Sequence, residues 1–481
     1  MKSNLIVYFY SFLLSFCFIT LFSSSTSWIY HDVEYLDADF FSVIGKYWAK
    51  GFLPYVDLWD HKGPFIHFCN AIGYWIAGDR IGVYWIQVFS LSITFYFAYK
   101  LLRIEFAYKH SFLLLLLSLF GLLNDYSSAG NNVEEFLLPF LTLSIYLMYK
   151  WLHQVNEYDI QHPYKYSIVY GVVLGVSILT RMTNAIGICG GVAVIAIVLL
   201  YRRKWMNLLS NIFGFFIGVV IVVLPFILYF WYYGALDEML YGTLWYNFEY
   251  ANTAPDLDPF SFNQRLYLLK SAINGMSLLI VSLILIFMSN TRLNGFLWFM
   301  VSFSSLLWLM SGNGFHHYFI ITYPFFCVLV NELYAFYKDK KNKNCYNLIF
   351  VYSSVLILAC TYEICGTYKS IVSNNENLGF YNDVLTNIPE NDRDSFIAYN
   401  VSPYIYLYMN VKPSCRFFAY QDAQISFVPS FRQKVQQDYS LCKAKWLLVK
   451  GHTTAISKLL EEKYRVVKSY NSNLKLYKRK S

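Results

Sequence analysis

Long uninterrupted apolar runs are the feature that most restricts what this chain can fold into. A helix needs about 17–25 apolar residues to cross the hydrocarbon core of a bilayer. In lipid, every backbone polar group must be satisfied within the protein, so an open sheet is excluded there. We therefore predict an all-α polytopic membrane protein. The clearest runs are residues 5–22, 83–99, 186–201, 212–233, 276–288, 315–330 and 348–360.

The composition excludes an ordinary soluble protein. Of the 481 residues, 57% are hydrophobic and only 14% are charged, whereas about 25% charged residues are usual in a soluble domain. The first apolar run follows Lys2 and resembles the core of a signal peptide. That run extends over about twenty residues, which is long for a signal core, so we predict an uncleaved first span.

The charges of the loops predict the orientation in the membrane. One set of loops holds 14 basic residues and the alternating set holds 7, so the positive-inside rule places the first set in the cytoplasm. The first set comprises Lys2 and residues 100–109, 150–165, 202–204, 292 and 338–343. The second, outer set comprises residues 28–80, 124–136, 181, 232–270 and 311–318.

This alternation holds only if residues 64–78 do not cross the membrane. They number about fifteen, which is short for a span, and we predict a helix at the outer face. The chain then has about eleven spans, an internal N-terminus and an external C-terminal domain. Residues 37–50 form a second predicted surface helix, with apolar and polar faces at helical spacing. Its apolar face comprises Phe40, Phe41, Ile44, Tyr47 and Trp48, and its polar face Asp39, Ser42, Lys46 and Lys50.

The C-terminal segment differs in charge and pattern from the rest. Residues 366–481 hold 17 Lys or Arg and 9 Asp or Glu, so they carry the whole net charge of +8. Such an excess suits anionic headgroups or a phosphorylated substrate, and equally a solvated lysine-rich surface. We predict a membrane module over residues 1–365 and a small extracytoplasmic α/β domain over 366–481. Cys415 and Cys442 could pair there, although sequence alone cannot establish a bridge.

Alternating short runs and intervening helical patterns support the α/β prediction. The predicted strands are residues 395–399, 416–419, 446–449, 464–470 and 474–477, and the predicted helices are residues 431–439 and 454–463.

Acidic residues gather in two outer loops. The first loop carries Glu34, Asp37 and Asp39, followed by Asp57 and Asp60. The next carries Glu134 and Glu135 directly before a span. A carboxylate at the mouth of a helix bundle is costly unless it is solvated, paired or used, and it can act as a general base. Each acid also has an ordinary explanation: a solvated loop, a pairing of Asp57 with His61 or Lys62, or a capping role for Glu134 and Glu135.

Cationic side chains are predicted on the same face. Arg181 lies between two apolar runs, and His316, His317 and Tyr318 begin another. An anionic lipid phosphate would suit these groups. The alternatives are a snorkelling arginine at a short turn and an interfacial anchor of aromatic character.

Taken in order, these motifs resemble the polytopic GT-C glycosyltransferases, in particular the protein O-mannosyltransferases and lipid A aminoarabinose transferases. Asp37 follows the first span and opens an amphipathic helix. The stretch from Asp57 to Pro64, which contains Lys62, is similar to the Lys/Gly-Pro stretch before the family's juxtamembrane helix. Glu134-Glu135 precedes a Leu-rich span, and His317-Tyr318 precedes Pro324. The resemblance covers about residues 1–340.

The resemblance implies an enzyme of cell-envelope glycan biosynthesis that transfers a sugar from a polyprenyl-phosphate donor to a lipid or glycan acceptor, usually with inversion. By match, Asp37 is the base on the acceptor hydroxyl, and Asp39 shares or replaces that role because the family's Asp-Glu pair is Asp37-Ala38 here. Glu134 or Glu135 orients a substrate. The expected donor-phosphate ligands are His61, Lys62, Arg181, His316, His317 and Tyr318, and the expected acceptor or sugar ligands are Glu34, Asp57 and Asp60.

Other consequences are coarser. The expected location is the bacterial inner membrane, in contact with membrane lipids, with the active site and C-terminal domain on the periplasmic face. No nucleic-acid partner is expected. The family leaves open whether a divalent metal ion takes part, and no other cofactor is implied. The main alternative is a transporter or flippase of lipid-linked sugars, which would place more charges deep within spans. A polysaccharide polymerase or ligase is a third reading.

Overall fold

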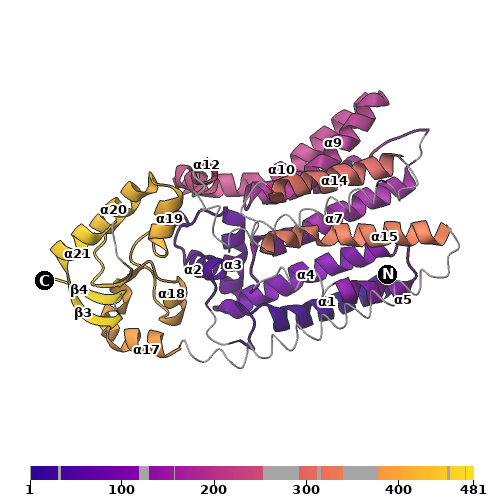
Figure 1. The fold of residues 1–481 in the computed structure, drawn as a ribbon. Helices are drawn as coiled ribbons and strands as arrows, with labels where there is room; N and C mark the ends of the chain where they lie inside the picture. The colour runs from indigo at the N-terminus through magenta and orange to yellow at the C-terminus, as the bar shows by residue number, and fades with distance from the viewer. Residues whose placement is uncertain are drawn as a thin grey trace, which may run out of the picture. The chain divides into compact units, whose positions relative to one another are not determined.

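The computed structural model divides into two compact units (Figure 1). The helix unit comprises Met1–Ser23, Trp85–Phe226 and Asp258–Lys369, and the sheet unit comprises Ser24–Tyr84, Ile227–Leu257 and Ser370–Ser481. The structure describes residues 2–30, 34–118, 129–155, 158–252, 286, 292–310, 316–339, 378–451, 455–471 and 473–480.

Helices form nearly all of the described part of the helix unit, as the apolar runs predicted. Among the described residues, four helical stretches are long and apolar enough to cross a membrane: Asn4–Phe22, Arg80–Leu102, Met182–Tyr201 and Trp205–Tyr232. They contain or overlap four of the predicted spans. The predicted spans at 276–288 and 348–360 lie outside the described residues, apart from residue 286. The number of crossings and their orientation therefore stay predictions.

The described helices that lie wholly or mostly in the helix unit are α1 (Lys2–Phe22), α4 (Arg80–Leu102), α5 (Tyr108–Ser118), α7 (Val133–Gln154), α8 (Tyr164–Ile178), the 3-10 helix η2 (Met182–Ala185), α9 (Ile186–Tyr201), α10 (Trp205–Tyr232), α14 (Arg292–Met310), the 3-10 helix η4 (His316–Thr322) and α15 (Tyr323–Asp339).

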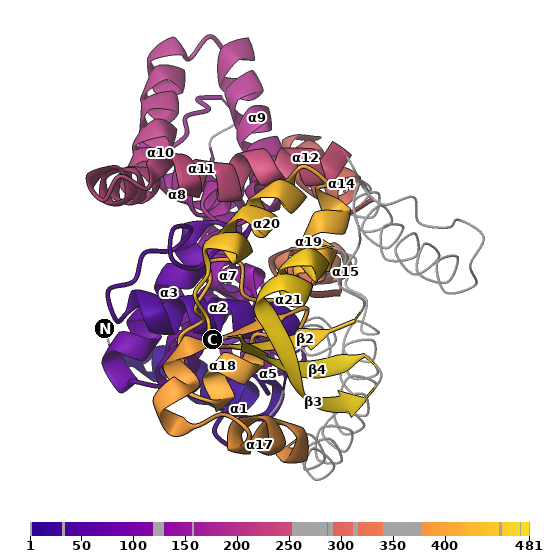
Figure 2. The ribbon, with the colours of Figure 1, turned by 90° about the vertical axis from the view of Figure 1, so that its left-hand side faces the viewer.

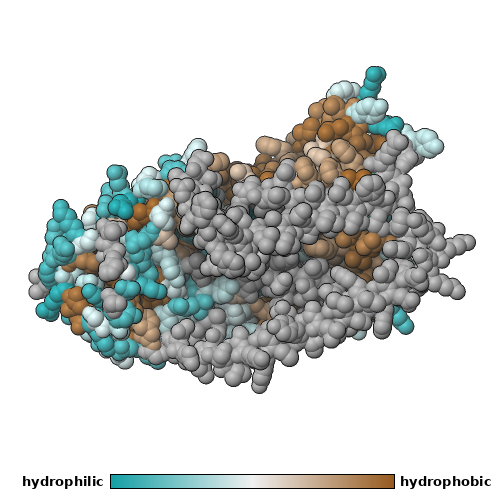
Figure 3. Space-filling view, in the orientation of Figure 1, coloured by the Kyte–Doolittle hydropathy of each residue, from teal (hydrophilic) through white to brown (hydrophobic). Residues whose placement is uncertain are grey.

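Large apolar side chains cover the outer surfaces of α9 and α10. Phe213 and Phe216 on α10 are 67% and 63% exposed, and Ile197 on α9 is 55% exposed. Figure 3 shows apolar residues gathered over this part of the helix unit. An exposed apolar area of this extent is unfavourable in water and stable in hydrocarbon. The chain is therefore an integral membrane protein.

The apolar run at 315–330 is helical where the structure describes it, from residue 316 on, but it is not one continuous α-helix. Residues His316–Thr322 form a 3-10 helix, and α15 begins at Tyr323. Pro324 lies in the first turn of α15 and has no N–H to donate to the preceding turn, which suits the change from a 3-10 helix to an α-helix at this point.

The sheet unit combines the segment that follows α1, residues 227–257 and the C-terminal segment. Its helices are α2 (Leu36–Trp48), α3 (Pro64–Ala77), α11 (Leu236–Leu240), the π-helix η3 (Tyr241–Trp245), α12 (Tyr246–Asn252), α17 (Leu378–Thr386), the 3-10 helix η6 (Glu390–Ser395), α18 (Tyr404–Tyr408), α19 (Gln421–Phe427), α20 (Phe431–Leu441) and α21 (Ser457–Lys463). Its strands are β1 (Phe396–Tyr399), β2 (Trp446–Lys450), β3 (Tyr464–Asn471) and β4 (Leu474–Arg479).

Helices α2 and α3 pack closely against each other. A Cβ atom at Gly45 of α2 would lie 2.4 Å from the Cβ of Asn70 on α3, so only glycine fits at this crossing. Helix α3 has 14 residues and is about 21 Å long at 1.5 Å per residue. It is therefore shorter than the hydrocarbon core of about 30 Å, in keeping with the predicted surface helix.

Helix α2 forms where it was predicted, but it is not half-exposed. The apolar residues Phe41 and Ile44 are buried, and so are Asp39 and Lys46 of the predicted polar face. Lys46 Nζ donates a hydrogen bond of 2.7 Å to Asn410 Oδ1. Our prediction of a polar face in solvent was wrong because the C-terminal segment covers that side of the helix.

Four strands form one mixed sheet in the order β1-β2-β4-β3. Figure 2 labels three of them, with β4 between β2 and β3. Strands β1 and β2 are parallel, and the other two pairs are antiparallel. Four of the five predicted strands are confirmed. Residues 416–419 are irregular instead, and Arg416 O accepts the backbone N–H of Trp59 at 3.0 Å. The adjacent Cys415 is disulfide-bonded to Cys442, with a Cα–Cα distance of 5.9 Å.

Candidate active site

The two acids at the start of α2 have different surroundings. Asp39 is 4% exposed, and its Oδ2 accepts the backbone N–H of Tyr35 at 2.7 Å. That bond satisfies an N–H at the helix start that has no intrahelical partner. Burial raises the pKa of Asp39 well above its usual value. Asp37 is only half-buried, and among the described residues, which omit 31–33, no partner contacts its carboxylate.

Two other predicted acids have local partners. Asp57 Oδ2 accepts the backbone N–H of Leu53 at 2.7 Å and closes the turn that precedes α3. It is this bond, and not a pairing with His61 or Lys62, that the structure shows for Asp57. Glu34 is exposed and lies near Ser402 and Lys450 of the C-terminal segment.

Asp60 lies between two histidines. Its Oδ1 accepts the backbone N–H of His61 at 2.7 Å and lies 3.2 Å from His61 Nδ1. Its Oδ2 lies 3.4 Å from Nε2 of His67 in α3. Asp60 is 3% exposed and His67 is fully buried, whereas the side chain of His61 is 30% exposed. The carboxylate therefore lies within ion-pair distance of a buried imidazole and of one that reaches the surface.

The charges of this group follow from burial and proximity. Burial alone would raise the pKa of Asp60, but the hydrogen bond from His61 and the positive charges of His61, His67 and Lys62 together outweigh it and lower the pKa to about 2. Burial lowers the pKa of His67 to about 4, against the opposing effect of Asp60. At neutral pH the group thus has an anionic Asp60 and a neutral His67.

Backbone hydrogen bonds hold the segment that carries these side chains. Tyr55 Oη donates to the carbonyl of Lys62 at 2.7 Å, and Asn247 Nδ2 donates to the carbonyl of His61 at 2.7 Å. Trp59 is 1% exposed, and its ring centroid lies 4.4 Å from that of Phe431. Lys62 is half-buried and directly precedes the Gly63 N-cap of α3. The C-terminal segment thus forms part of the support for this loop.

In the helix unit, Glu134 belongs to a second charged group. Its Oε1 lies 3.7 Å from Arg181 Nη1 and accepts a hydrogen bond of 3.2 Å from Asn184 Nδ2. The guanidinium of Arg181 lies 3.2 Å from the ring centroid of Tyr318. His317 packs edge-on against Tyr318, with ring centroids 4.6 Å apart. The structure therefore brings four of the predicted site residues together, whereas the side chain of His316 lies outside its description.

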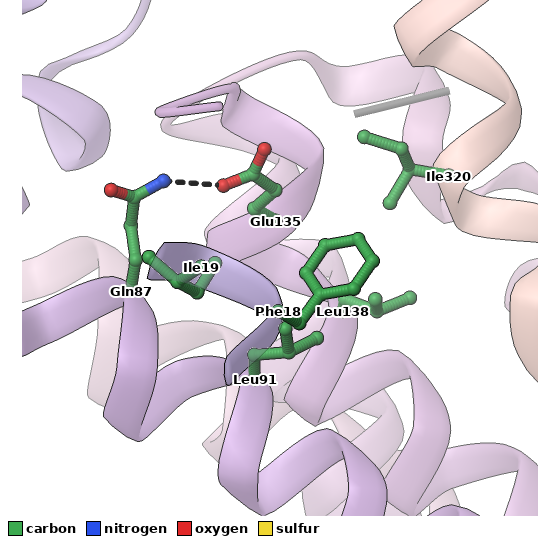
Figure 4. Close-up of a pocket in the computed structure, with 7 residues that line it drawn as sticks. All are labelled: Phe18, Ile19, Gln87, Leu91, Glu135, Leu138 and Ile320. Atoms are coloured by element: carbon green, nitrogen blue, oxygen red, sulfur yellow. Dashed lines mark hydrogen bonds between the residues drawn. The ribbon is translucent and has the colours of Figure 1, made fainter. Parts of the chain in front are cut away.

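Glu135 has a different environment from its neighbour. Its Oε2 accepts hydrogen bonds from Gln87 Nε2 at 2.7 Å and from the backbone N–H of Asn131 at 3.2 Å, and its Oε1 accepts one from Asn132 Nδ2 at 3.0 Å. Figure 4 shows the carboxylate turned towards Gln87 at the edge of a small pocket. The other lining residues are apolar: Phe18, Ile19, Leu91, Leu138 and Ile320. Three donors on one carboxylate indicate a structural role for Glu135.

Sequence reasoning missed His67, Asn184 and Gln87. His67 and Gln87 lie within apolar stretches, and Asn184 within a short polar turn. A polar residue in an apolar helical stretch is the signal that could have identified His67 and Gln87, because such a residue must be hydrogen-bonded or paired. Within the described ranges, no group of three or more His, Cys, Asp or Glu is arranged to hold a metal ion.

Comparison with known families connects this arrangement to a class of membrane enzymes. The family described as dolichyl-phosphate-mannose-protein mannosyltransferase matches residues 61–231. This match begins at His61 and covers the segment that contains Glu134 and Arg181. No curated protein sequence matches the chain significantly.

Solved structures extend the likeness to the whole chain. The structure of ArnT from Cupriavidus metallidurans bound to undecaprenyl phosphate matches with a TM-score of 0.59 and 12% identity, covering 99% of this chain and 98% of that one. The apo oligosaccharyltransferase of Archaeoglobus fulgidus matches with a TM-score of 0.52 and 14% identity, covering 93% and 69%. These likenesses show a shared fold. The resemblance to the GT-C glycosyltransferases, and within them to the protein mannosyltransferase and ArnT group, is therefore confirmed.

Proposed function

We propose that this protein is a membrane glycosyltransferase that moves a sugar from a polyprenyl-phosphate donor to an acceptor hydroxyl. The observation that carries the proposal is the fold shared with ArnT along 99% of the chain, since that structure contains undecaprenyl phosphate. The mannosyltransferase family match over residues 61–231 supports the same class of reaction. An apolar helical surface suits a donor whose long tail stays in the bilayer.

Asp37 is the proposed general base. Its carboxylate takes the proton of the acceptor hydroxyl as the oxygen attacks the anomeric carbon, and the bond between that carbon and the donor phosphate oxygen breaks. Attack from the face opposite the phosphate inverts the anomeric centre. The partial exposure of Asp37 supports this role, whereas Asp39 is buried and bonded to the start of α2. Asp39 therefore takes no share in the proposed chemistry.

Cationic groups stabilise the departing phosphate in this proposal. Lys62 and His61 lie in the loop that precedes α3, and Arg181 lies against Glu134 and Tyr318 in the helix unit. Positive charge aimed at a phosphate offsets the negative charge that develops as the sugar leaves. Glu134 sets the orientation of Arg181, and the half-buried Lys62 and 30% exposed His61 remain accessible to substrate.

We place the reaction on the outer face of the membrane, where the charge of the loops locates these acids. A bacterial inner membrane, with the C-terminal segment in the periplasm, agrees with the bond between Cys415 and Cys442, because disulfides persist in oxidising compartments. The acceptor is a lipid or glycan, and the 17 basic residues of segment 366–481 favour an anionic one.

Transfer of radiolabelled sugar from a polyprenyl-phosphate donor, measured in membranes that contain the protein, tests the proposal. Wild-type protein should transfer sugar, and Asp37→Asn should not, although it reaches the membrane in equal amount. Full activity of Asp37→Asn would remove Asp37 as the base. Movement of the lipid across the bilayer without sugar transfer, for every such donor tried, would instead support a flippase.

A further inference from the structure

His67 has no part in the reaction described above, yet its position is unusual. It lies in the second turn of α3 and is fully buried. Its ring packs edge-on against Phe41 and Tyr55, with centroid distances of 5.7 Å and 6.1 Å. An imidazole costs free energy in such an apolar setting unless its nitrogens are used. Neither nitrogen of His67 has a hydrogen-bond partner among the described residues, and Nε2 lies 3.4 Å from Oδ2 of the charged Asp60, within the distance of an ion pair.

Asp60 also lies beside a second histidine, His61, which reaches the surface. Its second oxygen lies 3.2 Å from Nδ1 of His61. That nitrogen is buried, although the side chain of His61 as a whole is 30% exposed. The exposed part of the ring is therefore the part away from Asp60, which includes Nε2. A carboxylate beside one imidazole nitrogen places a proton on that nitrogen and fixes how the other one is presented.

The backbone around His61 leaves little freedom other than the rotation of its ring. The carbonyl of His61 accepts a hydrogen bond from Asn247, and the carbonyl of Lys62 accepts one from Tyr55. The ring of Tyr246 lies beside that of His61, with centroids 5.6 Å apart. The contact with Asp60 then determines which way the ring faces.

We propose that Asp60 and His67 are positioning residues that fix the imidazole of His61 so that its Nε2 faces a phosphate oxygen of the lipid-linked donor. Nε2 of His67 lies against one oxygen of Asp60, and the other oxygen lies against Nδ1 of His61. Two anions, Asp60 and the phosphate, then face the two ring nitrogens of His61, and a nitrogen that carries a proton can donate to the anion that it faces. This inference rests on the proposed function, because it requires a polyprenyl-phosphate donor.

Binding of undecaprenyl phosphate to the full-length protein in lipid nanodiscs tests the inference without a turnover assay. His67→Phe removes the contact with Asp60 at similar volume, and Asp60→Asn removes the charge at equal shape. Each should weaken binding about 10- to 100-fold, the usual cost of losing a partner that orients a functional histidine. His67→Gln keeps an N–H near the position of Nε2 and should restore most of the affinity.

The same substitutions made in a His61→Gln variant distinguish a positioning role from a general loss of stability. In protein that carries His61→Gln, neither His67→Phe nor Asp60→Asn should weaken binding further, because the ring that they orient is gone. His162→Gln, which removes another buried imidazole, bonded to Asn211 in the helix unit, is the matched control and should leave binding unchanged. Thermal unfolding of each variant confirms folding.

The outcomes are distinct. Equal losses in the wild-type and His61→Gln backgrounds would show that His67 acts only on the fold, and would overturn the inference while the proposed function stands. Failure of wild-type protein to bind undecaprenyl phosphate or to transfer sugar from any such donor would overturn the proposed function itself, and the inference with it. If His67→Phe does not fold, Asp60→Asn decides the question alone.

Discussion

The acids of α2 and those of α7 form two pairs that look alike in sequence and differ in the same way in structure. In the sheet unit, Asp39 is buried and bonded to the start of its helix, while Asp37 is half-exposed. In the helix unit, Glu135 accepts three hydrogen bonds, while Glu134 faces Arg181. Asp39 and Glu135 thus each accept a backbone N–H near the start of their own helix, whereas Glu134 pairs with Arg181 of a distant segment. Proximity in sequence is therefore a poor guide to the surroundings of an acid.

The largest expected effect separates Asp37 from Asp39. Asp37→Asn should lower kcat for sugar transfer by about 10²–10⁴-fold, the contribution of a general base. Asp39→Asn should change kcat only a few-fold, because the amide oxygen can still accept the N–H of Tyr35. Measurement of kcat for both variants with one donor gives the comparison. Equal losses would show that the two acids share the role.

The α7 pair should show a split between activity and stability. Glu134→Gln leaves the charge of Arg181 without its partner, at a cost below the about 3–5 kcal/mol seen for fully buried pairs, since Arg181 is 18% exposed. Glu134→Gln should also reduce sugar transfer. Glu135→Gln removes an acceptor and should lower stability by about 1–3 kcal/mol.

Sugar transfer per folded molecule and the unfolding temperature, measured on both α7 variants, distinguish these effects. A catalytic defect confined to Glu135→Gln would reverse the assignment.

Removal of the disulfide should destabilise the sheet unit, in which both cysteines lie. Cys415 and Cys442 are 27 residues apart, and Cys415 adjoins the carbonyl that binds the N–H of Trp59. Replacing both with Ser should lower stability by about 2–4 kcal/mol. Thermal unfolding with and without a reductant measures this. The reductant should have no effect on the double variant, and sensitivity that persists there would point to another cause.

The smallest expected effect is a dependence of stability on pH. Burial lowers the pKa of His67 to about 4 from its ordinary value of 6.5, so the unfolded chain binds its proton more readily than the folded one. The free energy of unfolding is therefore unaffected by this group above pH 6.5, and it falls as the pH drops from 6.5 towards 4. The pKa of Asp60 is about 2, so this group lowers the free energy of unfolding only below its ordinary pKa of 3.8. That range lies outside the interval from pH 6.5 to 4.

His67→Gln should therefore flatten the decline in unfolding temperature between pH 6.5 and 4. His162, whose pKa burial also lowers to about 4, contributes in the same direction and should account for part of the remaining slope. An unchanged slope in His67→Gln would show that His67 does not titrate in this way.

Much of the fold could be predicted from local patterns. The apolar runs identified the long helices because hydrocarbon requires length and composition that few other folds need. Alternation identified four strands, and helical spacing identified α2. The prediction failed at 416–419 and at the polar face of α2, where distant segments contact the residues concerned. Asn410 accepts a hydrogen bond from Lys46, and the carbonyl of Arg416 accepts one from the backbone of Trp59. The partners of each bond are separated in sequence by more than half of the chain.

The sequence by itself determined that this protein lives in a membrane, that its acids gather in two loops, and that these loops resemble those of GT-C glycosyltransferases. Only the tertiary structure decided which groups each acid contacts and that His67 lies beside Asp60. The physical reason is that burial and hydrogen bonding depend on what surrounds a side chain. Those surroundings come from residues far apart in the chain, such as Glu134, Arg181 and Tyr318.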